Sequence, residues 1–213
     1  MSSNTVELIG YYGGDFAHAQ SAWTSTRRDL DADKIARIPK MLKDLATNGH
    51  HTPFEKSALH FLVTTDTASH IHIIKHRIGV SVNGESARYK ELKEDRYYLP
   101  EDWKDFGEIG NKWYNLLDGH TLKGNEYYHK ALEELTPLIG RKRAKESTRF
   151  FKGYNTQTQA DVMFNFRSFA HFLGLRKKPT AQDEIHWIAK DMLQLVKDIE
   201  GNPFEHTLAA FNL

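Results

Sequence analysis

The segment from Lys75 to Tyr89 holds the densest group of polar side chains in the sequence. Lys75, His76 and Arg77 stand at the end of an apolar stretch, and a run rich in glycine, serine and asparagine follows them. That run carries the polar residues Ser81, Asn83, Glu85, Ser86, Arg88 and Tyr89. Cationic side chains beside hydroxyl groups and loop amides form a natural pocket for an anion such as a phosphate. The alternative is a solvated helix end whose charges face water.

Three histidines in the same region raise the question of a metal site. His72 and His76 are four residues apart, so on a helix they share one face, as metal-binding pairs do, and His70 lies close by. No carboxylate at helical spacing completes a set of ligands. We therefore expect ordinary histidines and no metal.

Two further segments carry basic side chains. Residues 164–176 (FNFRSFAHFLGLR) predict a short helix with its phenylalanines toward the core. The residues able to face a pocket from it are Asn165, Arg167, His171 and Arg176. The alternative is an amphipathic helix with ordinary charges. Residues 141–145 (RKRAK) form a basic run that is more typical of a solvated helix face than of contact with RNA or DNA.

The elements that must position these side chains mix strand and helix patterns. Alternation predicts strands at 5–12, 57–65 and 156–163. Apolar periodicity predicts helices at 33–48, 67–78, 110–148, 164–176 and 183–199, with Thr67 as a cap and breaks near Gly119, Gly124 and 137–140. Residues 79–89 are expected to form a loop. Strands and long helices without regular βαβ repetition favour an α+β fold, and we expect one domain over residues 1–213.

The composition excludes several kinds of chemistry. The 213 residues include no cysteine, which rules out disulfides, thiolate metal sites and a cysteine nucleophile. The 29 Lys and Arg residues nearly balance the 28 Asp and Glu residues, so no general basic field for a nucleic-acid polymer exists. No apolar run has the length of a membrane span, and the N-terminus lacks the pattern of a signal peptide. We therefore expect a cytoplasmic protein.

Four blocks of sequence stand in a fixed order along the chain. They are residues 50–55 (HHTPFE), residues 75–77 (KHR) with 83–89 (NGESARY), residues 165–176 (NFRSFAHFLGLR) and residues 181–185 (AQDEI). Taken together, the blocks resemble the motifs of the flavin-dependent thymidylate synthases. In that family the second block reads Arg-His-Arg, followed by a spaced Ser-x-Asn-Glu-x-Ser-x-Arg-Tyr loop. The resemblance covers residues 50 to 205, and residues 95–145 add little to it.

The resemblance implies an α+β subunit with a central, mostly antiparallel sheet flanked by long helices. It implies a homotetramer whose active sites combine residues of several subunits. The activity it implies is that of a flavoprotein methyltransferase of nucleotide biosynthesis, which reductively methylates dUMP to dTMP. FAD would carry hydride, methylenetetrahydrofolate would donate the carbon and NADPH would be the reductant.

The resemblance also implies roles for particular residues. Flavin contacts would come from Thr52, Lys75, His76, Arg77, Glu85, Asn165, Arg167 and His171. Nucleotide contacts would come from His72, Lys75, Gly84, Glu85, Ser86, Ala87, Arg88, Arg149 and Arg176, with Arg149 reaching the phosphate side from a neighbouring chain. Arg176 would be the catalytic residue, because beside the uracil carbonyl and imide it would favour an ionised or polarised ring. No metal, no nucleic-acid polymer and no membrane is implied.

The absence of cysteine agrees with that mechanism. Methylation of a uracil carbon needs electron density at that carbon, and the common route adds a cysteine thiolate to the ring. A chain without cysteine still has the route in which flavin supplies hydride and a fixed guanidinium polarises the ring.

Departures from the family pattern fall on positions that read the nucleotide. Lys75 replaces an arginine and loses its planar fork, and His72 and His171 replace amide residues. The loop before Ser86 is one residue longer than usual, so Gly84 or Glu85 could hold the position of the family's glutamate. Two alternatives therefore stay open: an enzyme that modifies another pyrimidine nucleotide or leaves a different one-carbon group, and a non-catalytic protein that binds flavin or nucleotide. An RNA-binding module is disfavoured by the balanced charge.

Overall fold

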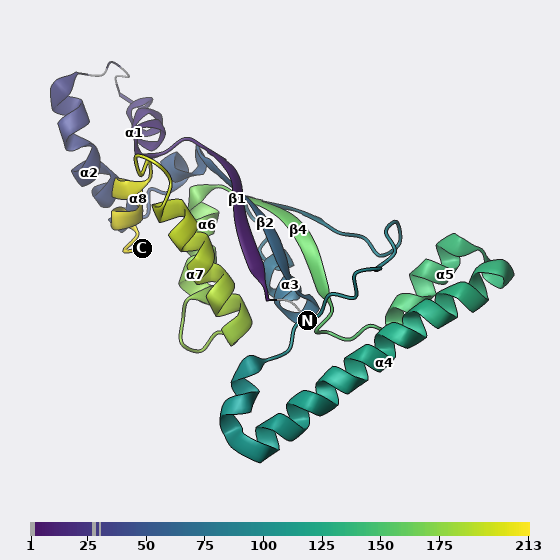
Figure 1. Cartoon of the computed structure of the whole chain (residues 1–213). Helices are drawn as coiled ribbons and strands as arrows, with labels where there is room; N and C mark the ends of the chain where they lie inside the picture. Colours follow the sequence, from purple (N-terminus) through teal and green to yellow (C-terminus); the bar gives the residue numbers. More distant parts are fainter. Residues whose placement is uncertain (1–2, 27–28, 30) are drawn as a thin grey trace. The chain divides into compact units, whose positions relative to one another are not determined.

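The computed structural model describes residues 3–26, 29 and 31–213, and the chain divides into two compact units. Unit 1 comprises Met1–Asn4, Thr64–Ile71 and Gly84–Ala160. Unit 2 comprises Thr5–Val63, His72–Asn83 and Asp161–Leu213. Each unit therefore gathers segments that lie far apart in the sequence, and each is described by itself with the labels of Figure 1.

A four-stranded sheet in the order β1-β2-β4-β3 forms the centre of unit 2. Its strands are β1 (Thr5–Tyr12), β2 (Ala58–Asp66), β3 (Val80–Gly84) and β4 (Gln157–Phe164). The end of β2, the last residue of β3 and the start of β4 belong to unit 1. The Asn165 amide donates to the Gly79 carbonyl, and the Glu85 amide donates to the Gln159 carbonyl. The residue number rises along β3 while that of its partner falls along β4, so the two strands are antiparallel. Helices with an antiparallel sheet confirm the α+β class.

The expectation of a loop over residues 79–89 is wrong for Val80–Gly84, which form β3. Serine, asparagine and glycine disfavour a strand by local propensity, but pairing with β4 outweighs that preference. β3 is at an edge of the sheet, where only one side needs a partner and polar residues are tolerated. The three strands predicted from alternation are confirmed as β1, β2 and β4.

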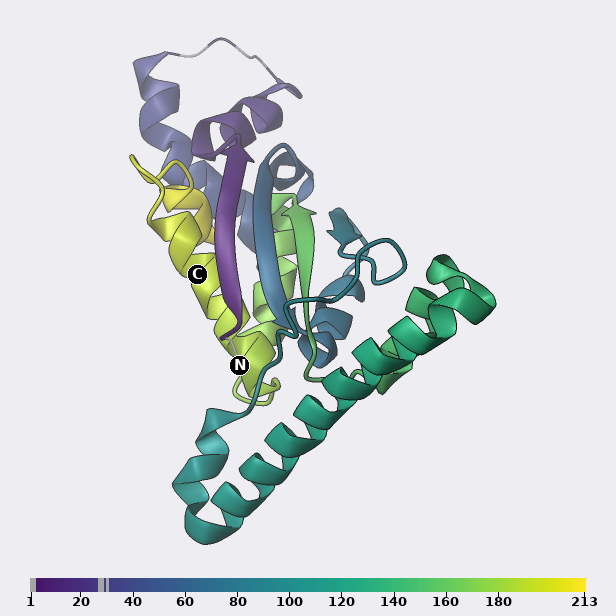
Figure 2. The same cartoon turned by 45° about the vertical axis from the view of Figure 1, so that its right-hand side comes forward.

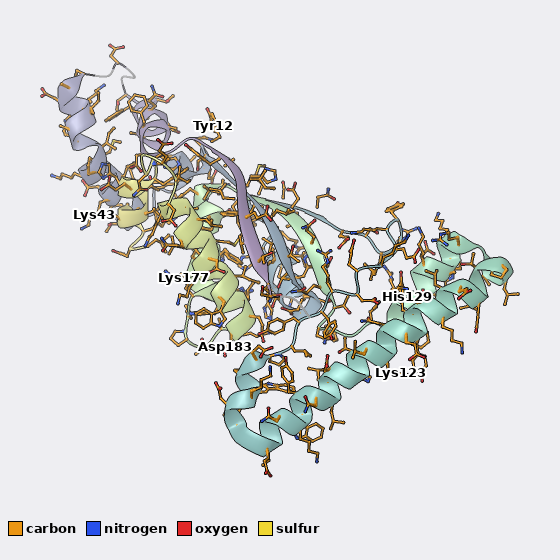
Figure 3. All side chains as sticks on the ribbon, viewed as in Figure 1. Tyr12, Lys43, Lys123, His129, Lys177 and Asp183 are labelled. Atoms are coloured by element: carbon orange, nitrogen blue, oxygen red, sulfur yellow. The ribbon has the colours of Figure 1, made fainter. Side chains whose placement is uncertain are left out.

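Two helices pack against one face of the sheet in unit 2. α6 (Phe166–Arg176) and α7 (Asp183–Lys197) lie side by side in both views (Figures 1 and 2), and both confirm helices predicted from periodicity. In the core between sheet and helices, the ring of Phe61 stacks on that of Phe169 with centroids 5.7 Å apart. The connection between α6 and α7 begins at Lys177 and ends before Asp183, the first residue of α7; both residues are labelled in Figure 3.

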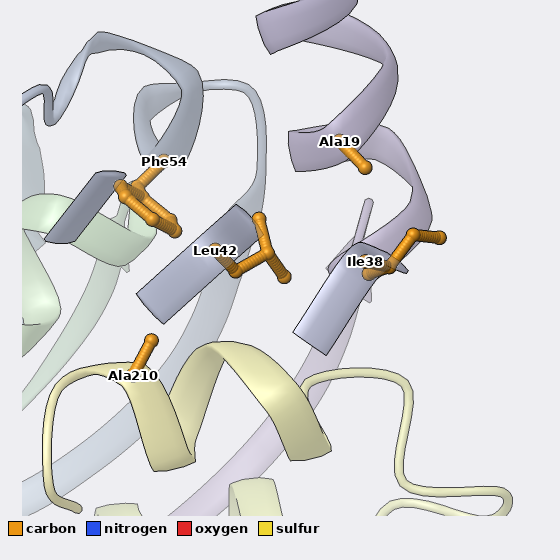
Figure 4. Packing of buried hydrophobic residues seen from close by; sticks show 5 residues of the cluster. All are labelled: Ala19, Ile38, Leu42, Phe54 and Ala210. Atoms are coloured by element: carbon orange, nitrogen blue, oxygen red, sulfur yellow. The ribbon is translucent and has the colours of Figure 1, made fainter. Parts of the chain in front are cut away.

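A second apolar cluster in unit 2 joins helices from both ends of the chain. The helices are α1 (Asp15–Trp23), α2 (Ala32–Thr47), the short 3₁₀ helix η1 (Thr52–Glu55) and α8 (Glu205–Ala210). Figure 4 shows the five buried residues of the cluster: Ala19, Ile38, Leu42, Phe54 and Ala210. The helix predicted over 33–48 is confirmed as α2, and it runs through Pro39 without a break. The cluster holds η1, which carries Thr52, at a fixed place in unit 2.

Unit 1 is built around one long helix. α4 (Gly107–Ile139) follows the 3₁₀ helix η2 (Glu101–Phe106), and α5 (Arg141–Thr148) folds back along it, as Figure 2 shows, before the 3₁₀ helix η3 (Arg149–Phe151). The predicted breaks at Gly119 and Gly124 are wrong, whereas the break at Gly140 is confirmed. A Cβ atom on Gly124 would lie 2.6 Å from the Phe151 carbonyl oxygen, so this glycine permits close packing instead of ending the helix.

The helix α3 (Thr67–Ile74) starts where predicted but with a different cap. The Asp66 carboxylate accepts a hydrogen bond from the Ser69 amide at 2.8 Å, as an N-cap does. The Thr67 hydroxyl instead donates to the Thr156 carbonyl at 2.9 Å. In the part of the chain that the structure describes, no helix combines the length and apolarity needed to cross a membrane.

Candidate functional site

In unit 2, Arg176 and His76 form a hydrogen-bonded pair. Arg176 is the last residue of α6, and His76 follows α3 directly after Lys75. The Arg176 Nε donates to the His76 Nε2 at a distance of 3.2 Å. Within the described residues Arg176 has no other hydrogen bond or ion pair, so its two terminal nitrogens have no protein partner.

The environment of this pair keeps His76 neutral. Burial, together with the nearby Arg176, His171 and His72, lowers the pKa of His76 to about 4. The ring of His76 packs edge-on against Phe172 at 5.0 Å between centroids and against His171 at 6.0 Å. Since Arg176 Nε is always a donor, the His76 Nε2 carries the lone pair and its proton is on Nδ1. Three residues expected at one site, His76, His171 and Arg176, are thus together.

The N-terminus of α6 is fastened to the turn that follows Arg77. The side-chain oxygen Oδ1 of Asn165 caps α6, because it accepts a hydrogen bond from the Ser168 backbone amide at 2.9 Å. The Ser168 hydroxyl donates to the Ile78 carbonyl at 2.6 Å. Gly79 has φ +66°, and a Cβ atom there would lie 2.3 Å from the Asn165 side chain. The sequence therefore folds so that the two motif segments are held against each other within unit 2.

Thr52 and Arg167 occupy neighbouring elements of unit 2. η1 packs against α6, and Arg167 forms an ion pair with Glu55 at the end of η1. Thr52 is exposed and lines a cavity of about 290 Å³ together with Ser21, Ala22, Ser25, Leu45, His50 and Pro53. The Arg167–Glu55 pair is largely exposed, and it adds little stability by itself. Both predicted flavin residues are accessible.

Lys75 and Arg77 present two uncompensated positive charges. Both side chains are exposed, and neither forms a hydrogen bond or ion pair within the described part of the chain. His72, on the last turn of α3, is half-buried. Cations without carboxylate partners can bind an anionic ligand without first breaking a salt bridge.

In unit 1, four of the predicted residues line one cavity. The cavity has a volume of about 620 Å³, and the predicted residues among its walls are Glu85, Ser86, Ala87 and Arg149. A cavity of this size suits a small-molecule ligand such as a nucleotide. Ser86 and Arg149 come here from the same chain, and the contribution of Arg149 to a neighbouring chain stays a prediction. Gly84 stands beside the cavity wall, where a Cβ atom would contact His70 at 3.5 Å.

Glu85 is held between two cations of its own loop. Its carboxylate lies 2.7 Å from Lys90 Nζ and 3.4 Å from Arg96 Nη2. The Glu85 hydrogen bond raises the pKa of Lys90. These contacts shape the loop that carries Ser86.

Arg88 does not point into this cavity. Its Nε donates to the Glu146 carboxylate of α5 at 2.9 Å, and Arg88 is absent from the cavity walls. The hydrogen bond from Arg88 lowers the pKa of Glu146. A role for Arg88 toward a phosphate therefore requires it to leave Glu146.

Lys152, which the sequence motifs do not predict, lies in the wall of the cavity in unit 1. Its side chain is 5% exposed and forms an ion pair with Asp95. Its Nζ also donates to Asn125 Oδ1 at 2.7 Å and lies 4.5 Å from the ring centroid of Tyr128. His129, labelled on α4 in Figure 3, contacts the same Asp95 carboxylate at 2.9 Å. Lys152 therefore fastens the loop of residues 92–96 to α4.

Comparison with known proteins places this chain in a family. The family model described as "Thymidylate synthase complementing protein" matches residues 7–200. A flavin-dependent thymidylate synthase of Pseudothermotoga lettingae is 34% identical over 194 residues, which cover 91% of this chain and 85% of that protein.

The chain belongs to the thymidylate synthase complementing protein family.

One further relative is similar to this chain in sequence, and one solved structure is similar to it in fold. A flavin-dependent thymidylate synthase of Streptomyces avermitilis is 28% identical, with 82% of this chain and 76% of that protein covered. Among solved structures, a UMP/dUMP methylase from Streptomyces cacaoi bound with 5-Br dUMP has a TM-score of 0.80 and 23% identity. That comparison covers 99% of this chain and 95% of that one, and it supports the fold.

Lys152 and His70 are among the cavity residues of this family member that the sequence motifs do not predict. Lys152 stands three positions after Arg149, and nothing in its local pattern separates it from a surface lysine. His70 lines the cavity with a buried Nδ1 that lacks a hydrogen-bond partner within the described residues. The sequence identifies His70 only as one of three neighbouring histidines, which are expected to be ordinary histidines, and it does not predict a place for His70 in the cavity wall. Among the described residues no group of three or more His, Cys, Asp or Glu side chains is arranged to hold a metal ion.

Proposed function

We propose that this chain is an FAD-dependent thymidylate synthase that reductively methylates dUMP to dTMP. The family model spans segments of both units, which supports treating residues 1–213 as one synthase-like domain. The observation that carries the proposal is the guanidinium of Arg176, whose Nε is anchored while both terminal nitrogens have no partner in the described structure.

Arg176 would polarise the uracil ring in place of a thiol. Its two terminal N–H groups match a carbonyl and the adjacent imide, and its charge stabilises electron density that develops on the ring. The chain has no cysteine that could form a thioether adduct with the ring. Among the described residues no carboxylate pairs with Arg176, so its positive charge would be available to the substrate.

The cavity of unit 1 would bind the nucleotide. Arg149 supplies a charge for the phosphate, and Ser86 supplies a hydroxyl group and a backbone amide. Ala87 adds an apolar wall. Binding of the phosphate would orient the base and so reduce the entropic cost of the reaction.

The residues of unit 2 fit a flavin with a diphosphate. When bound, FAD supplies hydride transfer. Lys75 and Arg77 would bind anionic phosphate oxygens, because their charges are uncompensated. Thr52, Asn165, Arg167 and His171 would contact the rest of the cofactor.

The remaining proposals concern cosubstrates and assembly. Methylenetetrahydrofolate would donate the carbon, NADPH would reduce the flavin, and the compartment would be the cytoplasm, where these metabolites are used. A homotetramer is supported by exposed apolar residues on α4, where Ile109, Trp113 and Leu116 follow helical spacing and are each more than half exposed.

Two measurements test the proposed function. The purified protein is expected to be yellow, and NADPH without oxygen is expected to bleach its flavin absorbance. Mass spectrometry of the nucleotide after addition of methylenetetrahydrofolate then identifies the product as dTMP. A colourless protein that takes up no FAD would exclude the flavin mechanism, and bleaching without methylation would favour a flavin-binding protein or another substrate.

A further inference from the structure

We propose that His76 is a positioning residue for Arg176: it accepts the Nε proton of Arg176 and so aims the terminal nitrogens at the pyrimidine ring. The inference rests on the proposed function and assigns His76 a task separate from contact with the flavin. The contact that carries it is the 3.2 Å hydrogen bond from Arg176 Nε to His76 Nε2.

A neutral acceptor suits this task better than a carboxylate would. A carboxylate binds the guanidinium through two parallel hydrogen bonds, which would occupy a terminal nitrogen and offset the positive charge. The hydrogen bond to His76 occupies only the Nε atom of Arg176. The full charge and both terminal nitrogens of Arg176 therefore remain for the uracil.

The packing around His76 fixes its ring and its protonation state. Phe172 and His171, both on α6, contact the ring from the same helix that ends in Arg176. The charged and titratable groups around it, Arg176, His171 and His72, all disfavour a second proton. A protonated His76 would present a donor to a donor, and the pair would separate.

The test compares two replacements of His76 in the FAD-loaded enzyme. His76→Leu keeps the bulk but removes the acceptor, whereas His76→Gln keeps a side-chain oxygen that can reach the same hydrogen. His76→Leu is expected to lower kcat for dUMP about 100-fold with a smaller change in KM, as loss of an oriented charge does. His76→Gln is expected to recover most of that loss. His120→Gln, on the exposed side of α4, is the control for replacing a histidine and should keep wild-type kcat.

Flavin absorbance per subunit is measured for each variant. Equal kcat losses in His76→Leu and His76→Gln would overturn the proposal, as would a His76→Leu enzyme that keeps kcat within about threefold. Loss of FAD from both variants would also overturn it, because His76 would then serve the cofactor.

A spectroscopic test separates this inference from the proposed function. Histidine-ring ¹⁵N NMR at neutral pH should find the His76 Nε2 unprotonated. In Arg176→Ala the pKa of His76 should rise, because the neighbouring cation is removed. A protonated Nε2, or a His76 titration that Arg176→Ala leaves unchanged, would contradict the pairing whichever nucleotide the enzyme methylates. Failure of the proposed function would instead appear as absent dTMP with an intact His76–Arg176 pair.

Discussion

Arg176 combines three features that a lysine at the same position could not supply. Its Nε is anchored to His76, its planar fork has two N–H groups for the substrate, and its charge has no carboxylate partner among the described residues. Lysine is a point charge on a flexible stem and offers no anchored donor beside a fork. The charge alone is therefore insufficient for the role we assign to Arg176.

Arg176→Lys is expected to lower kcat for dTMP formation by about 100-fold while FAD stays bound. The variant keeps the positive charge but loses both the anchor to His76 and the bidentate geometry. Steady-state rates and flavin absorbance measure the two quantities. Arg143→Lys, at an exposed position of α5, is the matched control and should behave as wild type. Full activity of Arg176→Lys would show that geometry at this position is unimportant.

His18 makes the stability of the protein depend on pH. It is fully buried, its Nδ1 lies 2.9 Å from the Thr207 hydroxyl oxygen, and its Nε2 has no partner within the described residues. The Thr207 hydroxyl donates to Asp15, so His18 must donate from Nδ1. Burial lowers the pKa of His18 to about 4 from 6.5, so only the unfolded state binds a proton between these values.

The free energy of unfolding should therefore fall as the pH is lowered from about 6.5 to about 4. Above pH 6.5 His18 is neutral in both states and does not reduce the free energy of unfolding. At a pH of about 4 the protonation of the unfolded state lowers that free energy by about 3 kcal/mol. Urea denaturation across this pH range measures the loss. His18→Asn keeps the donor to Thr207 but cannot titrate, so its stability should change less with pH. His120→Asn, the exposed control, should keep the wild-type dependence, and an equal slope in all three proteins would refute this account.

At the scale of elements, Lys152 links the loop of residues 92–96 to α4. Its contacts with Asp95 and Asn125 replace water around a nearly buried ammonium group. Asp95 has φ +47°, a strained conformation that these contacts help to hold. The arrangement ties a wall of the cavity of unit 1 to the helix α4.

Lys152→Met is expected to lower the free energy of unfolding by about 2 kcal/mol, because the partly exposed Asp95 loses its lysine partner and keeps only His129. The KM for dUMP should rise about tenfold as the cavity wall loosens. Urea denaturation and steady-state kinetics test both effects. Lys130→Met, at an exposed position of α4, controls for loss of a lysine. An unchanged KM in a destabilised Lys152→Met protein would limit Lys152 to a structural role.

Two glycines of α4 should respond in opposite ways to the same change. Gly119→Ala adds a Cβ atom in open space and should stabilise the protein by about 0.5–1 kcal/mol, because alanine favours a helix. Gly124→Ala places its Cβ 2.6 Å from the Phe151 carbonyl oxygen and should destabilise by about 1–3 kcal/mol. Thermal or urea denaturation compares them. Similar effects of the two changes would mean that η3 does not pack on α4 as described.

The same glycines show where prediction from sequence reaches its limit. The apolar periodicity of α2 and α7 and the alternation of β1, β2 and β4 are local signals, and those elements were predicted. A glycine in a helical pattern predicts a break in the helix. Only the structure shows that Phe151 packs against Gly124, so that the glycine serves close packing. β3 was missed because its pairing with β4 involves residues about 80 positions away, which no local pattern records.

At the scale of the whole molecule, the motifs name site residues without revealing their partners. The motif arginine Arg176 could be predicted, but the hydrogen bond to His76 joins positions 100 residues apart. Lys152 and His70 line the cavity without belonging to a motif, so only tertiary packing identifies them. Arg88 was predicted from its motif, and its ion pair with Glu146 depends on where α5 folds back.

The proposed homotetramer can be tested through the exposed apolar residues of α4. Trp113 is 55% exposed, and a second subunit would cover it. Trp113→Lys should weaken the assembly, because a charge would be buried in an apolar interface. Light scattering coupled to size exclusion measures the mass at several protein concentrations. Lys112→Ala is the neighbouring control. A tetramer that Trp113→Lys leaves intact would place the interface elsewhere, and a wild-type monomer would exclude the assembly.

The most direct test of the central claim is a competition among nucleotides analysed by mass spectrometry. The FAD-loaded protein receives NADPH, methylenetetrahydrofolate and an equal mixture of dUMP, dCMP and dUTP. The account predicts that dUMP alone gains a methyl group and becomes dTMP, and that Arg176→Ala forms none. Methylation of another nucleotide in preference to dUMP, or methylation of none while the flavin is reduced, would contradict it.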